Sequence, residues 1–128
     1  MSLLTILHCS CLYQVKEIGA VMYDCPCLAE DMAKIFDVYW ALGGEDAVIP
    51  DRWPEELWTD INVDNPLNVK LNGTAMNTYL SSAPPPFCPD GRTKDLTAIL
   101  NTIQSAEKFV YVAVMDYLPL LVYGNPIR

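Results

Sequence analysis

The chain has 128 residues and a mass of 14.3 kDa, enough for one domain that buries about two thirds of the surface its unfolded form would expose. Hydrophobic residues make up 52% and charged residues 19%, a globular composition that argues against a disordered tail. Eleven acidic residues against two basic ones give residues 24–64 a net charge of −9, within a total of −8. This acidic section repels phosphate groups, so we expect the chain alone not to bind nucleic acid.

A strand and then a helix are predicted near the start of the chain. Residues 15–23, VKEIGAVMY, are β-rich and become apolar toward their end, which predicts a strand that enters a core. After Pro26 the apolar residues recur every three or four positions, which predicts a helix that ends at Gly43 and Gly44. The residues expected on its buried face are Leu28, Met32, Ile35, Phe36, Tyr39 and Trp40. The residues expected in solvent are Glu30, Asp31, Lys34 and Asp37.

The middle of the chain is rich in turn-forming residues. Three prolines and several Asp and Asn residues in 45–66 predict a long excursion with few regular elements, anchored by Trp53 and Trp58. Residues 67–82 predict two short strands around an Asn-Gly turn. The stretch SSAPPPFCPDGRTKDL follows at 81–96, and we interpret its prolines as a stiff connector. The alternative is a polyproline ligand, which requires Pro84–Pro86 to be accessible.

A second helix and strand are predicted at the end of the chain. Helical spacing begins at Thr93, a plausible N-cap, and continues in an apolar stripe of Leu96, Ile99, Leu100 and Ile103. The run KFVYVAVMDYLP, 108–119, suits a central strand buried on both faces. The order of elements makes the fold class mixed α/β. No helix follows the last strand to cover the sheet, so we expect an incomplete fold that exposes apolar strand edges and aggregates or stays partly unfolded.

Candidate catalytic and metal-binding residues are scarce. The chain has a single histidine, His8, in an unpatterned stretch without an orienting partner. Its CSC and CPC motifs leave one residue between cysteines, whereas zinc sites usually leave about two to four. We therefore expect no metal site and no cofactor, and we interpret Cys25, Cys27 and Cys88 as disulfide candidates. Cys25 and Cys27 are too close to bond each other without strain, so each needs a partner elsewhere.

The remaining polar motifs point to processing rather than catalysis. The neighbouring acids Glu30/Asp31 and Glu55/Glu56 are interpreted as a solvated surface, not as catalytic carboxylates. Asn72-Gly73-Thr74 is an N-glycosylation sequon at a predicted turn, and with five cysteines it favours the secretory pathway. The longest apolar runs are far shorter than the roughly 20 residues that cross a bilayer, so no transmembrane segment is expected in this chain.

Three stretches resemble a known family. Residues 15–43, 71–96 and 109–119 are similar to the single-pass type II branch of the phospholipase D superfamily, which contains lysosomal 5′-exonucleases and a relative regarded as inactive. The similarity covers about residues 14–128, and SAPPPFCPDGRT is its most specific segment. The resemblance implies an incomplete phospholipase D-type fold, made of the end of a first half-domain and the start of a second.

The resemblance also implies where catalysis would occur. Family members carry two HxKxxxxD motifs, whose histidines act as nucleophile and general acid on a phosphodiester. The first motif would precede the strand at 15–23 and the second would lie beyond Arg128. His8 is followed at the required position by Ser10 instead of lysine, so the chain holds neither motif and we expect no catalytic residue in it. The residues nearest to the parent active site, by position alone, are Met115, Asp116 and Tyr117.

The resemblance divides the chain into four sections. These are an unrelated segment at 1–13, the end of the first half-domain at 14–44, a crossing segment at 45–92, and the start of the second half-domain at 93–128. In the family the cysteines that match Cys25 and Cys27 bond with more N-terminal cysteines, and the family's usual sequon before them is replaced here by Asp24.

The expected function is therefore that of a fragment of a phospholipase D-family phosphodiesterase. The parent would hydrolyse single-stranded nucleic acid or phospholipid, and its remaining half-domains or a homologous subunit would be the partners. The expected location is the endoplasmic reticulum, Golgi and lysosome lumen, as part of a type II membrane glycoprotein. The alternative is a non-catalytic isoform that acts by protein binding, in the cytoplasm if the short form exists.

Overall fold

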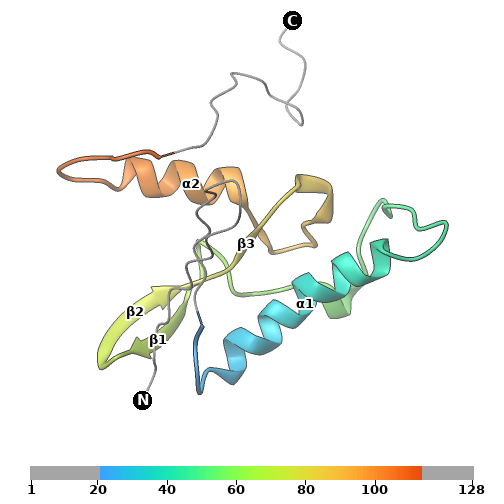
Figure 1. Cartoon of the computed structure of the whole chain (residues 1–128), viewed down its shortest axis with the longest axis horizontal. Helices are drawn as coiled ribbons and strands as arrows, with labels where there is room; N and C mark the ends of the chain where they lie inside the picture. Colours follow the sequence, from blue (N-terminus) through green and yellow to red (C-terminus); the bar gives the residue numbers. More distant parts are fainter. Residues whose placement is uncertain (1–20, 114–128) are drawn as a thin grey trace, which may run out of the picture.

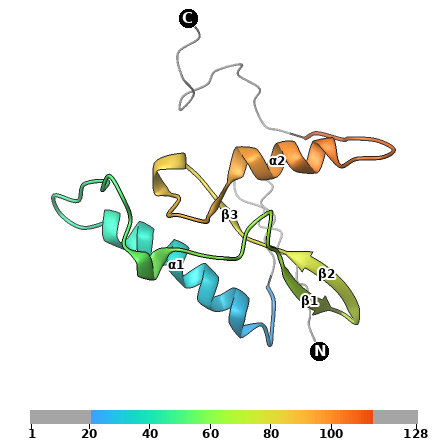
Figure 2. The same ribbon diagram turned by 180° about the vertical axis from the view of Figure 1, so that it is seen from behind.

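The computed structural model describes residues 21–113 and shows a mixed α/β arrangement, as predicted (Figure 1). Its elements, in chain order, are α1 (Pro26–Leu42), the 3₁₀ turn η1 (Glu55–Leu57), β1 (Leu67–Leu71), β2 (Thr74–Thr78), β3 (Ser81–Ser82), the 3₁₀ turn η2 (Pro85–Phe87), β4 (Thr93–Lys94) and α2 (Asp95–Gln104). β1 and β2 pair antiparallel, and β3 pairs with β4 in parallel. The two helices lie on opposite sides of β3, and the long excursion runs along α1 (Figures 1 and 2).

Helix α1 has the predicted limits but not the predicted buried face. Pro26 occupies its first turn, where a missing N–H costs nothing, and the Gly43 amide closes the last turn on the Tyr39 and Trp40 carbonyls. Its buried residues are Leu28, Asp31 and Val38. Leu28 was expected in the core, whereas Met32, Phe36, Tyr39 and Trp40 are 48%, 59%, 47% and 74% exposed. The prediction was wrong for these four because, in the described residues, the excursion packs on the Asp31 side of the helix.

The hairpin forms as the sequence predicts. Leu71 pairs with Thr74 at the end of the β1–β2 ladder, and the two residues between them make the turn. Asn72 and Gly73 have φ angles of 50° and 86°, the left-handed backbone that an Asn-Gly turn supplies at low cost. The hairpin carries few buried side chains, and Asn68 and Asn77 bond across it on its exposed surface.

The proline segment is folded against the body. Its Ala83–Pro84 peptide is cis. The Trp53 indole donates to the Pro86 carbonyl at 2.9 Å, and the Tyr39 hydroxyl donates to the Ala83 carbonyl. Pro84 and Pro85 are half-buried and Pro86 is exposed, and Pro85–Phe87 form the turn η2 instead of an extended segment. These contacts disfavour the polyproline-ligand alternative, which requires an accessible extended segment. They also confirm that Trp53 anchors the excursion.

The C-terminal part differs from the prediction in two ways. Helix α2 begins at Asp95 with Lys94 as its N-cap residue, whereas Thr93 belongs to β4 and its hydroxyl accepts the Val63 amide at 3.0 Å. Of the strand expected at 108–119, residues 108–113 form no strand and the others lie outside the described residues. A strand needs a partner for its backbone groups, and none of the described residues pairs with this segment. Of the strand expected at 15–23, residues 21–23 likewise form none and the others lie outside the described residues.

Large apolar side chains are buried at few places. Within residues 21–113 the buried hydrophobic residues are Leu28, Val38 and Trp53. No helix in that range is both long and apolar enough to cross a membrane. Packing of the described residues therefore depends heavily on polar contacts, which converge under α1.

Candidate functional site

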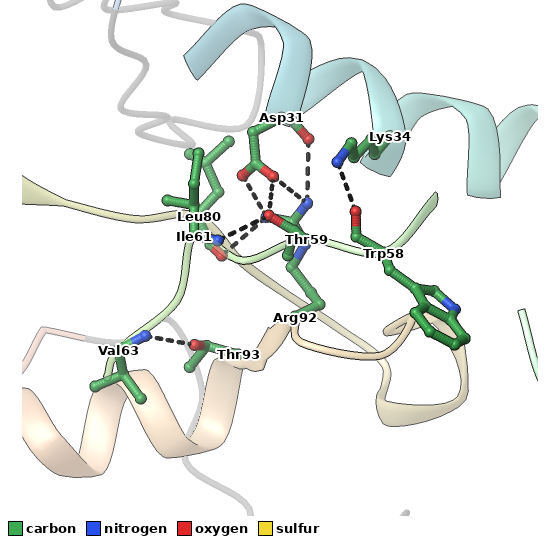
Figure 3. A network of polar contacts seen from close by, with 9 residues as sticks. All are labelled: Asp31, Lys34, Trp58, Thr59, Ile61, Val63, Leu80, Arg92 and Thr93. Atoms are coloured by element: carbon green, nitrogen blue, oxygen red, sulfur yellow. Dashed lines mark hydrogen bonds and ion pairs between the residues drawn. The ribbon is translucent and has the colours of Figure 1, made fainter. Parts of the chain in front are cut away.

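A buried ion pair joins α1 to the segment before α2 (Figure 3). Arg92 Nη1 lies 2.5 Å from Asp31 Oδ2, and Nη2 lies 2.8 Å from Asp31 Oδ1. The two side chains are 0% and 2% exposed. This bidentate geometry matches the planar guanidinium to the carboxylate, which is the strong form of such a pair. The expectation that Asp31 belongs to a solvated surface is therefore wrong.

Additional bonds satisfy the buried charges. Arg92 Nη2 also donates to the Asp31 backbone carbonyl at 3.1 Å, and Nη1 donates to the Leu80 carbonyl at 3.3 Å. The Thr59 hydroxyl donates to Asp31 Oδ1 at 2.5 Å and accepts the Ile61 amide at 3.1 Å. Arg92 Nε has no partner among the described residues. Asp31, Thr59 and Arg92, called the clasp below, thus connect the helix, the excursion and the connector.

The clasp depends on a glycine beside it. Gly91 has a φ of 82°, and a Cβ built there would lie 1.8 Å from the Thr59 carbonyl oxygen. The Thr59 amide also donates to the Asp90 carbonyl at 3.2 Å, so the two backbones run in direct contact. No other residue type fits this position without moving Thr59, which would misplace its hydroxyl relative to Asp31.

A second group of contacts holds the excursion farther along α1. Lys34 Nζ donates to the Trp58 carbonyl at 2.5 Å, and the Trp58 indole donates to the Trp53 carbonyl at 2.9 Å. The Arg52 guanidinium lies 4.2 Å from the Trp58 ring centroid and 3.0 Å from Asp90. The Arg52–Asp90 pair is largely exposed, with side chains 66% and 57% accessible. Trp58 is thereby confirmed as an anchor.

The chemistry of the clasp is structural. Both of its charges are neutralised and hydrogen-bonded within the protein, so neither group is placed to transfer a proton to a substrate. Within residues 21–113 no three His, Cys, Asp or Glu side chains gather to hold a metal ion. The described part of the chain therefore shows a joint between segments.

Comparison with known proteins identifies the family of this chain. A family model described as a PLD-like domain of the PLD3/4 type matches residues 5–125. The chain belongs to this family. The phospholipase D-like resemblance seen in the sequence is thereby confirmed.

Relatives in the PLD3/4 family are similar over most of this chain. It is 53% identical over 117 residues to a human protein named 5′-3′ exonuclease PLD3, and 51% identical over 117 residues to the protein of that name from Bos taurus. It is 45% identical over 108 residues to the mouse protein named 5′-3′ exonuclease PLD4. The PLD3 matches cover 91% of this chain but 24% of the relatives. The chain thus spans about a quarter of their length.

The sequence-predicted site residues of this PLD-like chain are not brought together. Asn72 lies exposed at the tip of the hairpin. Cys25, Cys27 and Cys88 are free thiols in the structure, so their pairing stays a prediction. Met115, Asp116 and Tyr117, named by position, lie outside the described residues. Sequence reasoning missed the clasp, because Asp31 and Arg92 are 61 positions apart and no local pattern connects them.

Cys88 differs from the other two described thiols in its surroundings. Its Sγ donates to the Ser82 carbonyl at 3.2 Å. Burial raises the pKa of the Cys88 thiol, and the Ser82 side chain and the nearby Lys94 and Arg92 charges only partly offset this. A raised thiol pKa lowers the thiolate fraction at neutral pH, so Cys88 is a poor nucleophile in this state.

Arg92→Met tests the clasp. The substitution leaves the Asp31 carboxylate buried without its countercharge, which costs about 3–5 kcal/mol for such pairs. We expect the Ile61 amide, bonded to Thr59, to exchange with deuterium at least about tenfold faster, since each 1.4 kcal/mol is a factor of ten. Arg52→Met is the matched control, because an exposed pair contributes about 1 kcal/mol or less. Similar exchange of Ile61 in both variants would contradict the assigned role.

Gly91→Ala tests the close approach of the two backbones. The added Cβ meets the Thr59 carbonyl, so the Arg92 side chain leaves its buried position and trypsin cleaves after it more rapidly than in the unchanged chain. Gly73→Ala is the control, since Gly73 has a similar φ of 86° but open space around it. It bears only the left-handed backbone cost, about 1–2 kcal/mol. Equal cleavage rates after Arg92 in the two variants would show that the contact is unimportant.

Proposed function

We propose that this chain is a section of a phospholipase D-family phosphodiesterase of the 5′-3′ exonuclease type and is catalytically inactive alone. The observation that carries the proposal is the histidine content. His8 is the one histidine in the 128 residues, and Ser10 stands where an HxKxxxxD motif requires lysine. Without a positioned histidine the chain has no group suited to attack a phosphodiester and protonate its leaving group at neutral pH.

The role of the section would be to set two half-domains against each other. In the proposed division, Asp31 belongs to the end of the first half-domain, whereas Thr59 and Arg92 belong to the crossing segment that leads into the second. The buried bidentate pair supports this role, because it has one productive geometry and therefore favours one arrangement of the segments it joins. Catalytic histidines supplied by the remaining half-domains would then meet at a fixed separation.

We also propose a substrate and a cellular location for the parent protein. Relatives named 5′-3′ exonucleases favour single-stranded nucleic acid over phospholipid as the substrate of the parent. The acidic character of residues 24–64 supports placing the nucleic-acid contacts outside this chain. The exposed Asn72 supports glycosylation in the endoplasmic reticulum and Golgi, on the way to a lysosomal lumen.

A second candidate function is protein binding by a non-catalytic short isoform. The apolar surface of α1 formed by Met32, Phe36 and Trp40 favours it, since stacked Phe36 and Trp40 rings stand exposed with centroids 5.7 Å apart. Exposed aromatic patches of this kind mark interaction sites or surfaces covered in a larger protein. The two candidates differ in whether the remaining half-domains are present.

An exonuclease assay tests the absence of catalysis. The purified 128-residue chain is expected to release no nucleotide from the 5′ end of a single-stranded oligonucleotide beyond the level of His8→Ala. The activities of the two chains should be indistinguishable, because no lysine stands two positions after His8 in the sequence. Cleavage that His8→Ala abolishes would place a catalytic group in this chain and refute its inactivity.

The size of the endogenous protein separates the two candidates. An immunoblot with an antibody against residues 81–96 is expected to show a band several times larger than 14.3 kDa that shifts when N-glycans are removed. Asn72→Gln expressed in the same cells should remove part of that shift. A band near 14.3 kDa without a shift would overturn the parent-phosphodiesterase proposal and favour the short binding isoform.

A further inference from the structure

The turn of the β1–β2 hairpin joins an asparagine directly to a glycine. Asn72 and Gly73 form this turn at the tip of the hairpin, and both are exposed (Figures 1 and 2). A Cβ built at Gly73 would have nothing within 4 Å. Neither the Gly73 N–H nor the Asn72 side-chain amide makes a hydrogen bond with another residue of the range 21–113. The Gly73 nitrogen and Asn72 Cγ are therefore free to react with each other.

This pair of residues can close a cyclic imide. The Gly73 backbone nitrogen gives its proton to water or hydroxide and attacks Asn72 Cγ, and Nδ2 takes up a proton and leaves as ammonia. The new bond closes a five-membered ring. Water then opens the ring at one of its two carbonyl carbons, which gives aspartate or isoaspartate in place of Asn72. The net change is asparagine plus water to acid plus ammonia, so the reaction needs no oxidant and no cofactor.

The backbone of the turn suits this ring closure. The positive φ angles of Asn72 and Gly73, 50° and 86°, are those of a type I′ turn. Ring closure requires the peptide between the two residues to rotate, which converts the turn to type II′. A type II′ turn keeps the positive φ of Asn72 and needs a negative φ at Gly73, which glycine adopts as readily. The pairing of Leu71 with Thr74 at the end of the ladder can therefore persist.

Two other asparagines of the hairpin lack these properties. Asn68 Nδ2 donates to Asn77 Oδ1 at 3.1 Å, and both residues lie within the paired strands. The residues that follow them, Val69 and Thr78, are β-branched and crowd the nitrogen that would attack. Asn72 is the one asparagine in the sequence that glycine follows. The reaction is therefore expected at Asn72 and not at its neighbours.

We propose that Asn72 is a site of spontaneous deamidation and that deamidation and N-glycosylation exclude each other there. An N-glycan is attached to Nδ2, which deamidation removes, and neither product is a glycan acceptor. Isoaspartate also adds a backbone atom to a turn matched to its ladder, so it weakens the pairing of the hairpin. The glycan part of the inference rests on the secretory location proposed above, whereas the deamidation part does not.

Incubation of the unglycosylated chain tests the deamidation. The purified 128-residue chain is kept at neutral pH and physiological temperature, and each asparagine is followed by peptide mass spectrometry. Asn72 should convert to aspartate and isoaspartate while Asn68 and Asn77 stay amides. A peptide of residues 69–76 is the reference. The chain should react within about tenfold of the peptide's rate, because the turn must make only one peptide rotation.

Asn72→Gln is the matched control for the ring chemistry. Glutamine keeps the side-chain amide but needs a larger ring, so ammonia release at this position should be at least about tenfold slower. Three results would overturn the deamidation: a rate in the chain more than about tenfold below that of the peptide, equal conversion at Asn68 and Asn77, or an unchanged rate in Asn72→Gln.

Glycosylated chain from secretory cells tests the exclusion. Enzymatic release of the glycan in water that carries a heavy oxygen isotope labels each asparagine that bore a glycan. Incubation before release should turn the glycan-free copies of Asn72 into unlabelled aspartate and isoaspartate and leave the labelled fraction constant. A labelled fraction that falls during incubation would contradict the exclusion. Absence of any glycan at Asn72, with deamidation of the purified chain, would refute the proposed location and leave the deamidation standing.

Discussion

The arrangement of the described chain depends on the Asp31–Arg92 ion pair. A guanidinium and a carboxylate removed from water are costly to keep apart, and their attraction offsets the desolvation only where the geometry and the additional bonds are good. Both requirements are met here except at Arg92 Nε, which has no partner among the described residues. The carboxylate accepts from Arg92 and from the Thr59 hydroxyl, and the guanidinium reaches two backbone carbonyls as well. Three segments far apart in the sequence are therefore held in one relative position.

The surrounding contacts are also hydrogen bonds between side chains and distant backbone groups. The excursion between α1 and β1 has one short turn, η1, as its regular element, so its backbone groups find partners one at a time. Lys34 bonds the Trp58 carbonyl, Trp53 bonds the Pro86 carbonyl, and Tyr39 bonds the Ala83 carbonyl. Each of these hydrogen bonds contributes only about 1 kcal/mol net to stability. Their main effect is to fix the path of the excursion, because each bond has a preferred direction.

The exposed apolar surfaces lie apart from the buried polar contacts of the clasp. Polar groups are buried where the segments cross, whereas the large apolar side chains of α1, α2 and residues 109–112 remain exposed. A protein that folds entirely by itself normally shows the reverse distribution. The pattern agrees with a chain that spans about a quarter of its PLD3 relatives, in which further protein would cover these surfaces. Under the function proposed above, the clasp joins two half-domains and these exposed surfaces contact them.

The sequence by itself determined the family, the mixed α/β class, the limits of α1, the Asn-Gly hairpin and the irregular excursion with its Trp53 anchor. These features depend on signals within a few residues, such as Pro26 before the helix, Gly43 after it, and the left-handed preference of Asn72 and Gly73. Only the tertiary structure decided which face of α1 is buried and which residue caps α2. Asp31 is buried because it pairs with Arg92, 61 positions away, and Thr93 lies in β4, where its hydroxyl accepts the Val63 amide. It likewise left residues 108–113 without strand pairing, since a strand exists only where another backbone accepts its hydrogen bonds.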